Sequence, residues 1–134
     1  MGKFLEKART LRNDPDAHYN CAQAVMGAFA PDAGLSMEEA CRVSANFGGG
    51  MKMAATCGAV TSALMVLGLY GIEDPATVGA LFRAVRDNHN GCLNCADLLR
   101  MNREAGGEKK PHCDGMVYEA VALVEQILEE RGLV

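Results

Sequence analysis

One stretch of the sequence restricts the fold more than any other, because positions 56–70 are apolar on almost every side of a helix. Its apolar residues are Ala59, Val60, Ala63, Leu64, Met65, Val66, Leu67 and Leu69. A helix without a polar face is normally surrounded by other helices. The stretch therefore predicts a buried central helix. The longest apolar run, 63–70, contains Gly68 and is far too short to cross a bilayer, so no membrane insertion is expected.

Helix start and stop signals divide the rest of the chain into further helices, and no segment favours a strand. Ser36 followed by Glu39 is a capping-box pattern, and Asp74-Pro75 is an N-cap followed by proline at the first helical position. The expected helices cover 3–11, 20–29, 36–47, 56–70, a segment from 74, a short one after 94, and 114–131. Residues 104–111 are polar and are expected to form a mobile loop. We predict a single all-α domain over residues 1–134, a compact bundle of about five to seven helices.

Composition narrows the function classes. The formal charge is -4 and the basic residues are scattered, which argues against a nucleic-acid partner. The first ten residues alternate charged and apolar side chains, unlike a signal peptide, so a cytoplasmic protein is expected. Structural disulfides are disfavoured there, and six cysteines then indicate metal binding, catalysis or redox chemistry. The alternative is that they are small buried hydrophobic residues.

Four of the six cysteines fall where a helix is expected to begin. Cys21 and Cys95 each follow an asparagine, Cys57 follows a glycine-rich turn, and Cys113 precedes the last helix. The first N–H groups of a helix have no intrahelical partner, and the helix dipole places positive charge there. A thiolate at such a position is stabilised as a nucleophile or metal ligand. If the helices converge, the four sulfurs could hold a metal ion (iron or zinc) or an iron–sulfur cluster, or pair as reversible disulfides.

Other residues near these cysteines are candidates for supporting roles. Gly48, Gly49 and Gly50 form a run longer than a helix connector requires, which favours a functional loop. Cys92 forms a Cys-x-x-Cys with Cys95, a spacing used by zinc sites and dithiol redox centres. His112, adjacent to the last of the four cysteines, is an additional candidate ligand. Cys41 lies within an expected helix beside apolar neighbours, and we interpret it as a core residue.

These motifs resemble a known family. The segments that carry the resemblance are Asn20-Cys21-Ala22-Gln23, Phe47-Gly48-Gly49-Gly50-Met51, Cys57-Gly58-Ala59-Val60, Cys95-Ala96-Asp97-Leu98 and Cys113. They resemble the C_GCAxxG_C_C family of redox-active proteins, over a region from about residue 20 to the last helix. The resemblance implies a small helical domain with four characteristic cysteines, matched here by Cys21, Cys57, Cys95 and Cys113. Ser62 stands where the family pattern has glycine, and Cys92 is extra, so either member of the Cys-x-x-Cys supplies the third sulfur.

The family is also similar to the non-haem part of split-Soret cytochromes, which implies iron–sulfur binding. Covalent haem is not implied, because the chain has no Cys-x-x-Cys-His. The leading hypothesis is a redox protein, acting in electron transfer or as a thiol–disulfide oxidoreductase with a redox partner protein. A structural zinc or metal-binding module without a redox role, and a helical interaction protein with inert cysteines, remain as alternatives. A homodimer is among the assemblies left open.

Overall fold

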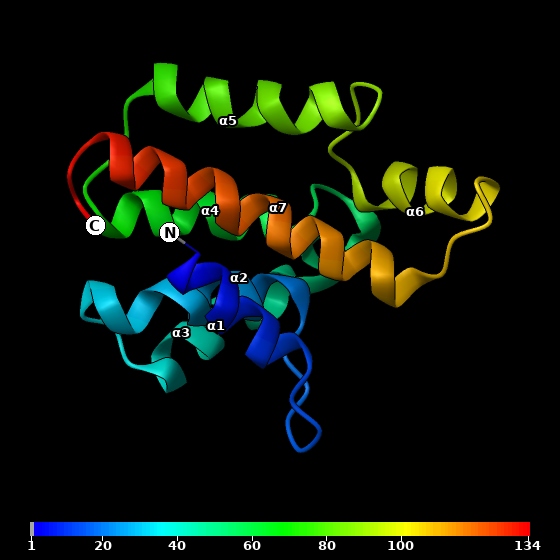
Figure 1. Ribbon diagram of the computed structural model, residues 1–134. Helices are drawn as coiled ribbons and strands as arrows, with labels where there is room; N and C mark the ends of the chain where they lie inside the picture. Colours follow the sequence, from blue (N-terminus) through cyan, green and yellow to red (C-terminus); the bar gives the residue numbers. More distant parts are fainter. Residues whose placement is uncertain (1) are drawn as a thin grey trace.

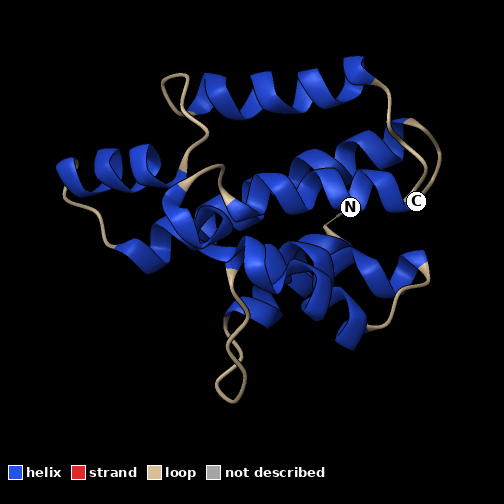
Figure 2. Ribbon diagram, turned by 180° about the vertical axis from the view of Figure 1, so that it is seen from behind, coloured by secondary structure: helices blue, strands red, loops and turns tan. Residues whose placement is uncertain are grey.

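The computed structural model describes residues 2–134 and is built from helices (Figure 1). The seven α-helices are α1 (Lys3–Arg12), α2 (Cys21–Phe29), α3 (Met37–Ser44), α4 (Gly58–Leu69), α5 (Pro75–Asn88), α6 (Cys95–Glu104) and α7 (Lys109–Glu130). Figure 2 shows loops between them and no strand in this part of the chain, where the only bridge of strand type pairs Thr56 with Asn94. The predicted all-α class is confirmed.

Side-chain caps fix where several helices begin. Asn20 accepts a hydrogen bond from the Gln23 N–H at 2.9 Å, and its own N–H donates to the Gln23 side chain at 3.0 Å. Ser36 and Glu39 make the same reciprocal pair at the start of α3, as predicted. Asp74 caps α5, where a proline follows at the first position. Each cap satisfies N–H groups that the helix itself leaves free.

The core forms around α2 and α4. Helix α4 packs against α2 and α7, and only Gly68 and Leu69 at its C-terminal end are exposed. This confirms the predicted buried central helix, although α2 shares the interior, because all of its residues from Ala24 to Phe29 are buried. The ring of Phe4 in α1 stacks on that of Phe29 with 4.4 Å between centroids.

The helices are arranged in three groups. Helices α1, α2 and α3 lie together on one side, α4 and α7 run alongside each other in the middle, and α5 lies along the opposite side (Figures 1 and 2). Helix α6 extends beyond the end of the bundle at which α7 begins. Among residues 2–134, no helix has both the length and the hydrophobicity needed to cross a bilayer.

The start of α7 differs from the prediction. The helix begins at Lys109 rather than at Asp114, and the expected mobile loop is reduced to residues 105–108. Pro111 occupies the third helical position, where the backbone N–H has no intrahelical partner, so the proline does not interrupt the helix. Cys113 therefore lies in the second turn of α7.

Cys41 is not the core residue that we predicted. Helix α3 buries Ala40 and Ser44, which lie one turn apart on the same face. Cys41 follows Ala40 by one position and is turned away from this face, so it is only half-buried. Val43, on whose apolar character the prediction depended, is 55% exposed.

Candidate cysteine site

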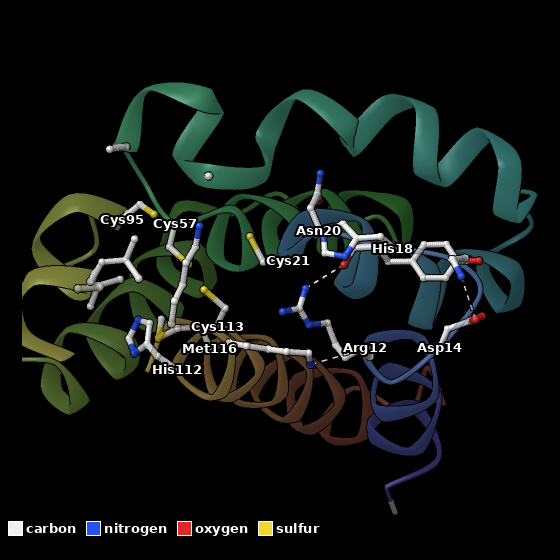
Figure 3. A pocket seen from close by; sticks show the side chains of 18 residues that line it. Arg12, Asp14, His18, Asn20, Cys21, Cys57, Cys95, His112, Cys113 and Met116 are labelled. Carbon is white, nitrogen blue, oxygen red and sulfur yellow. Dashed lines mark hydrogen bonds between the residues drawn. The ribbon is translucent and has the colours of Figure 1, made fainter. Parts of the chain in front are cut away.

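Four cysteines line one cavity of about 630 Å³. Figure 3 shows Cys21, Cys57, Cys95 and Cys113 around a common space, with Arg12 on one side and His112 on the other. The cavity is lined by Arg12, Asp14, Ala17, His18, Tyr19, Asn20, Cys21, Gly49, Ala54, Cys57, Cys95, Leu98, Leu99, Lys109, Lys110, His112, Cys113 and Met116. The convergence of sulfurs from distant parts of the chain is therefore observed.

Helix starts place three of the four sulfurs. Cys21 is the first residue of α2, Cys95 is the first residue of α6, and Cys57 immediately precedes α4. These positions agree with the prediction. Cys113 is the exception, because α7 begins earlier than expected and the influence of a helix terminus fades beyond its first turn.

Backbone hydrogen bonds link the two chain segments that carry Cys57 and Cys95. The N–H of Cys57 donates to the carbonyl oxygen of Leu93 at 2.8 Å, and the N–H of Cys95 donates to that of Ala55 at 2.6 Å. These bonds join the segment before α4 to the segment before α6. The positions of Cys57 and Cys95 are consequently fixed relative to each other by the main chain.

Two glycines provide the space that two of the cysteines occupy. A Cβ atom on Gly58 would lie 2.8 Å from the Cys21 sulfur and 2.5 Å from the Phe47 carbonyl oxygen. A Cβ atom on Gly50 would lie 2.9 Å from the Cβ of Cys95. Carbon atoms do not approach other heavy atoms this closely without a shift, so both positions require glycine for close packing around the sulfurs.

Gly48 and Gly49 also contribute to the site. A Cβ on Gly48 would lie 2.5 Å from side-chain atoms of Asn20, the cap of α2. Gly49 lines the cavity, and its N–H is a hydrogen-bond donor to the Cys21 sulfur. The backbone then stays in an unusual conformation, with positive φ at Gly49, Gly50, Met51, Lys52 and Ala54. Non-glycine residues at positive φ carry conformational strain.

Cys21 has the environment of a thiolate. The Cys57 thiol donates a hydrogen bond to its sulfur, and this contributes most to lowering the pKa of Cys21 to about 6. Burial opposes the shift. The N–H groups of Gly49 and Ala22 and the positive charge of Arg12 add to the lowering. Hydrogen bonds and positive charges favour the ionised form of a thiol, so Cys21 is ionised at neutral pH.

The other three thiols are held in the protonated form. The hydrogen bond to Cys21 raises the pKa of Cys57, and burial raises it further. Burial is the main cause of the raised pKa of Cys95 and of Cys113, and the negative charge of Cys21 adds to it in both. The site therefore combines one thiolate with three thiols.

One family model matches most of the chain. The family model described as "Putative redox-active protein (C_GCAxxG_C_C)" matches residues 19–127, a segment that includes all four cavity cysteines. The chain belongs to the C_GCAxxG_C_C family. No curated protein and no solved structure matches the chain.

Of the other candidate residues in this C_GCAxxG_C_C protein, some line the cavity and others lie outside it. Cys95 lines the cavity, whereas Cys92 does not, and the Cys92 sulfur lies 3.8 Å from the carbonyl oxygen of Asn90. His112 and His18 both line the cavity. Burial is the main cause of a lowered pKa of His112, which keeps its ring neutral at neutral pH.

The donor set does not fit a single metal ion in this arrangement. Among residues 2–134, no three or more His, Cys, Asp or Glu side chains lie close enough together to hold one. Zinc and iron ions bound by proteins need three or four such ligands at short distances. An iron–sulfur cluster has several irons, which accept thiolates from separate directions, and four cysteines around one cavity are compatible with that pattern.

Sequence reasoning missed the basic residues of the C_GCAxxG_C_C site. Arg12, Lys109 and Lys110 line the cavity beside the cysteines. The two lysines closely precede Cys113 in the sequence, and that proximity is a signal that could have identified them. Arg12 had no comparable signal, because α1 reaches the cavity only through its packing against α2 and α7.

Proposed function

We propose that the protein is a dithiol redox protein in which Cys21 is the nucleophile and Cys57 is its partner. The observation that carries this proposal is that half-buried Cys21 and buried Cys57 line the same cavity. The lowered pKa of Cys21, caused mainly by Cys57, supports it. Thiol–disulfide exchange needs an accessible thiolate and a second thiol within reach of it. Cys21 and Cys57 meet these requirements.

The exchange transfers two electrons in two steps. The Cys21 thiolate attacks one sulfur of a substrate disulfide, which breaks that S–S bond, forms a mixed disulfide and releases one substrate thiolate. Cys57 then loses its proton to the released thiolate and attacks the Cys21 sulfur. The second substrate thiolate leaves and takes up a proton from water. The protein dithiol has become a disulfide, and the substrate disulfide has become two thiols.

The main cause of the raised pKa of Cys57 is removed during this reaction. In the resting site, the bond to the Cys21 thiolate is the main cause of the raised pKa of Cys57. That cause disappears when Cys21 enters the mixed disulfide, because its sulfur no longer carries a negative charge. Cys57 is then easier to deprotonate at the step in which it acts as a nucleophile.

A redox titration with peptide mapping tests the proposal. We expect one two-electron transition, with a Cys21–Cys57 disulfide found by mass spectrometry in the oxidised protein. The Cys57→Ser variant should lose this transition. Cys41→Ser, which alters a half-buried cysteine outside the cavity, is the matched control and should keep it. Full oxidation of the wild type with both cysteines still alkylatable would contradict the proposal.

An iron–sulfur cluster is a second candidate, favoured by the fact that all four cysteines face one cavity. Cluster ligation would require thiolates at all four positions. Protein purified without air would then contain iron and acid-labile sulfide and absorb visible light, and Cys95→Ser and Cys113→Ser would each lower the iron content. The dithiol proposal instead expects both variants to retain the Cys21–Cys57 transition.

A helical interaction protein with inert cysteines makes a different prediction from either candidate. Serine variants at Cys21 and Cys57 would then change neither metal content nor reaction with disulfides.

We place the proposed chemistry in the cytoplasm, where a reducing pool keeps thiols free. A partner protein would return the oxidised protein to the dithiol state.

A further inference from the structure

Basic side chains outnumber acidic ones in the cavity lining, although the chain as a whole is negative. The lining includes Arg12, Lys109 and Lys110, against a formal charge of -4 for the chain. The one carboxylate in the lining, Asp14, accepts hydrogen bonds from the N–H groups of residues 16 and 17. Asp114 lies behind the lining and pairs with both Arg12 and Lys110, so a single negative charge is shared between two positive ones.

Lys109 adds a positive charge that has no ion-pair partner in the described part of the chain. Across residues 2–134, it makes no ion pair or side-chain hydrogen bond. Lys109 lines the same cavity as Cys95 and Cys113, and its charge lowers the pKa of both thiols. Arg12 also lines the cavity, at the end away from Cys95 (Figure 3), and its charge lowers the pKa of Cys21 and of Cys113.

The remaining walls are apolar and the volume is limited. Leu98, Leu99 and Met116 line the cavity between the charged groups. A volume of about 630 Å³ is in the range of cavities that bind small organic molecules rather than protein segments. A ligand that matches these walls has an uncharged middle and negatively charged ends.

We propose that the substrate of this site is a small disulfide carrying carboxylates, held between Arg12 and Lys109 with its S–S bond against Cys21. The inference rests on the proposed dithiol function and names its substrate class. The electrons come from the Cys21–Cys57 dithiol, which is oxidised to a disulfide while the substrate is reduced to two acidic thiols. Complementary charge concentrates such a substrate at the site and orients it for attack.

Single-turnover rates with three disulfides of different charge test the inference. The pre-reduced protein is mixed with oxidised glutathione, which is anionic, with bis(2-hydroxyethyl) disulfide, which is neutral, and with cystamine, which is cationic. We expect the rates to fall in that order after correction for the intrinsic reactivity of each disulfide with a free thiol. Added salt should slow the anionic substrate selectively.

Substitution of Lys109 separates recognition of the substrate from activation of the thiols. Lys109→Gln should slow reaction with oxidised glutathione by about 3- to 10-fold and leave the rate with the neutral disulfide unchanged. The matched control is Lys7→Gln, which removes a lysine of α1 outside the cavity lining and should change neither rate. Lys109 is exposed, so its replacement should not unfold the protein.

Three outcomes would overturn the inference. Equal corrected rates for the three disulfides would exclude recognition by charge and leave the dithiol function in place. Equal slowing of all three substrates by Lys109→Gln would mean that the lysine acts on the thiols and not on the substrate. Failure of the wild type to react with any of the three disulfides would overturn the dithiol function together with this inference.

Discussion

Cys21 and Cys57 carry the same side chain, and their surroundings drive their pKa values in opposite directions. We predict that alkylation of Cys21 by iodoacetamide rises with pH around a midpoint near 6. Cys57→Ala should raise this midpoint, because it removes the main cause of the lowered pKa, and Cys57→Ser should raise it less, since a hydroxyl still donates. Peptide mass spectrometry across the pH range measures the midpoint. An identical midpoint in all three proteins would show that the hydrogen bond has no such effect.

A second prediction at the scale of single residues concerns Gly58. Gly58→Ala should destabilise the fold by about 1–3 kcal/mol, because the new Cβ meets both the Cys21 sulfur and a backbone oxygen. Gly68→Ala in the same helix is the control. Nothing lies within 4 Å of its new Cβ, so stability should rise by about 0.5–1 kcal/mol. Urea denaturation of the two variants measures both changes, and similar effects would contradict the role of Gly58.

At the scale of elements, the segment between α3 and α4 forms part of the cavity wall. Gly49→Ala and Gly50→Ala both force alanine to positive φ, at a cost of about 1–2 kcal/mol each. Only the Gly50 variant also pushes a Cβ against other atoms, which are the Ala55 backbone at 2.5 and 2.6 Å and the Cβ of Cys95 at 2.9 Å. We therefore expect Gly50→Ala to be less stable than Gly49→Ala and to change the alkylation rate of Cys95. Equal stability of the two variants would contradict the close packing at position 50, and an unchanged alkylation rate of Cys95 would contradict its contact with Cys95.

The elements also show which parts of the structure were predictable. Local signals such as the Ser36–Glu39 pair and Asp74-Pro75 were sufficient to locate helix starts, because capping depends on neighbouring residues. The start of α7 was predicted wrongly because residues 104–111 were interpreted as a polar loop, whereas the first turn of the helix accommodates Lys109, Lys110 and Pro111. In the site, Cys21, Cys57 and Cys95 followed from the same start signals, whereas Cys113 lies in the second turn of α7. The contact between Cys21 and Cys57 did not follow from these signals, because it depends on how α2 packs against α4.

At the scale of the whole molecule, one ion pair joins the two ends of the chain beside the cavity. The Nε of Arg12 in α1 lies 2.6 Å from a carboxylate oxygen of Asp114 in α7, and both side chains are largely buried. Arg12→Met should destabilise the protein by about 2–3 kcal/mol, less than for an isolated buried pair because Lys110 still balances Asp114. Adding Asp114→Asn should recover part of the loss in a double-mutant cycle. Strictly additive losses in urea denaturation would show that the pair is not coupled.

The redox state should change the stability of the entire fold in a pH-dependent way. A Cys21–Cys57 disulfide closes a ring of roughly 37 residues, which stabilises the oxidised protein by about 4 kcal/mol through the restricted unfolded chain.

The reduced protein has a compensating contribution that depends on pH. Its Cys21 pKa is about 6 when folded and close to the ordinary value of 9.0 when unfolded. The thiolate therefore stabilises the reduced fold increasingly between these two values, and this contribution is absent below about pH 6. The advantage of the oxidised protein in thermal unfolding should consequently be largest near pH 5 and should shrink by at least ~1 kcal/mol by pH 8. Cys57→Ser, which cannot form the disulfide, should show no difference in unfolding between oxidising and reducing buffers at either pH. An advantage that stays constant with pH in the wild type would mean that the Cys21 thiolate does not contribute to folding.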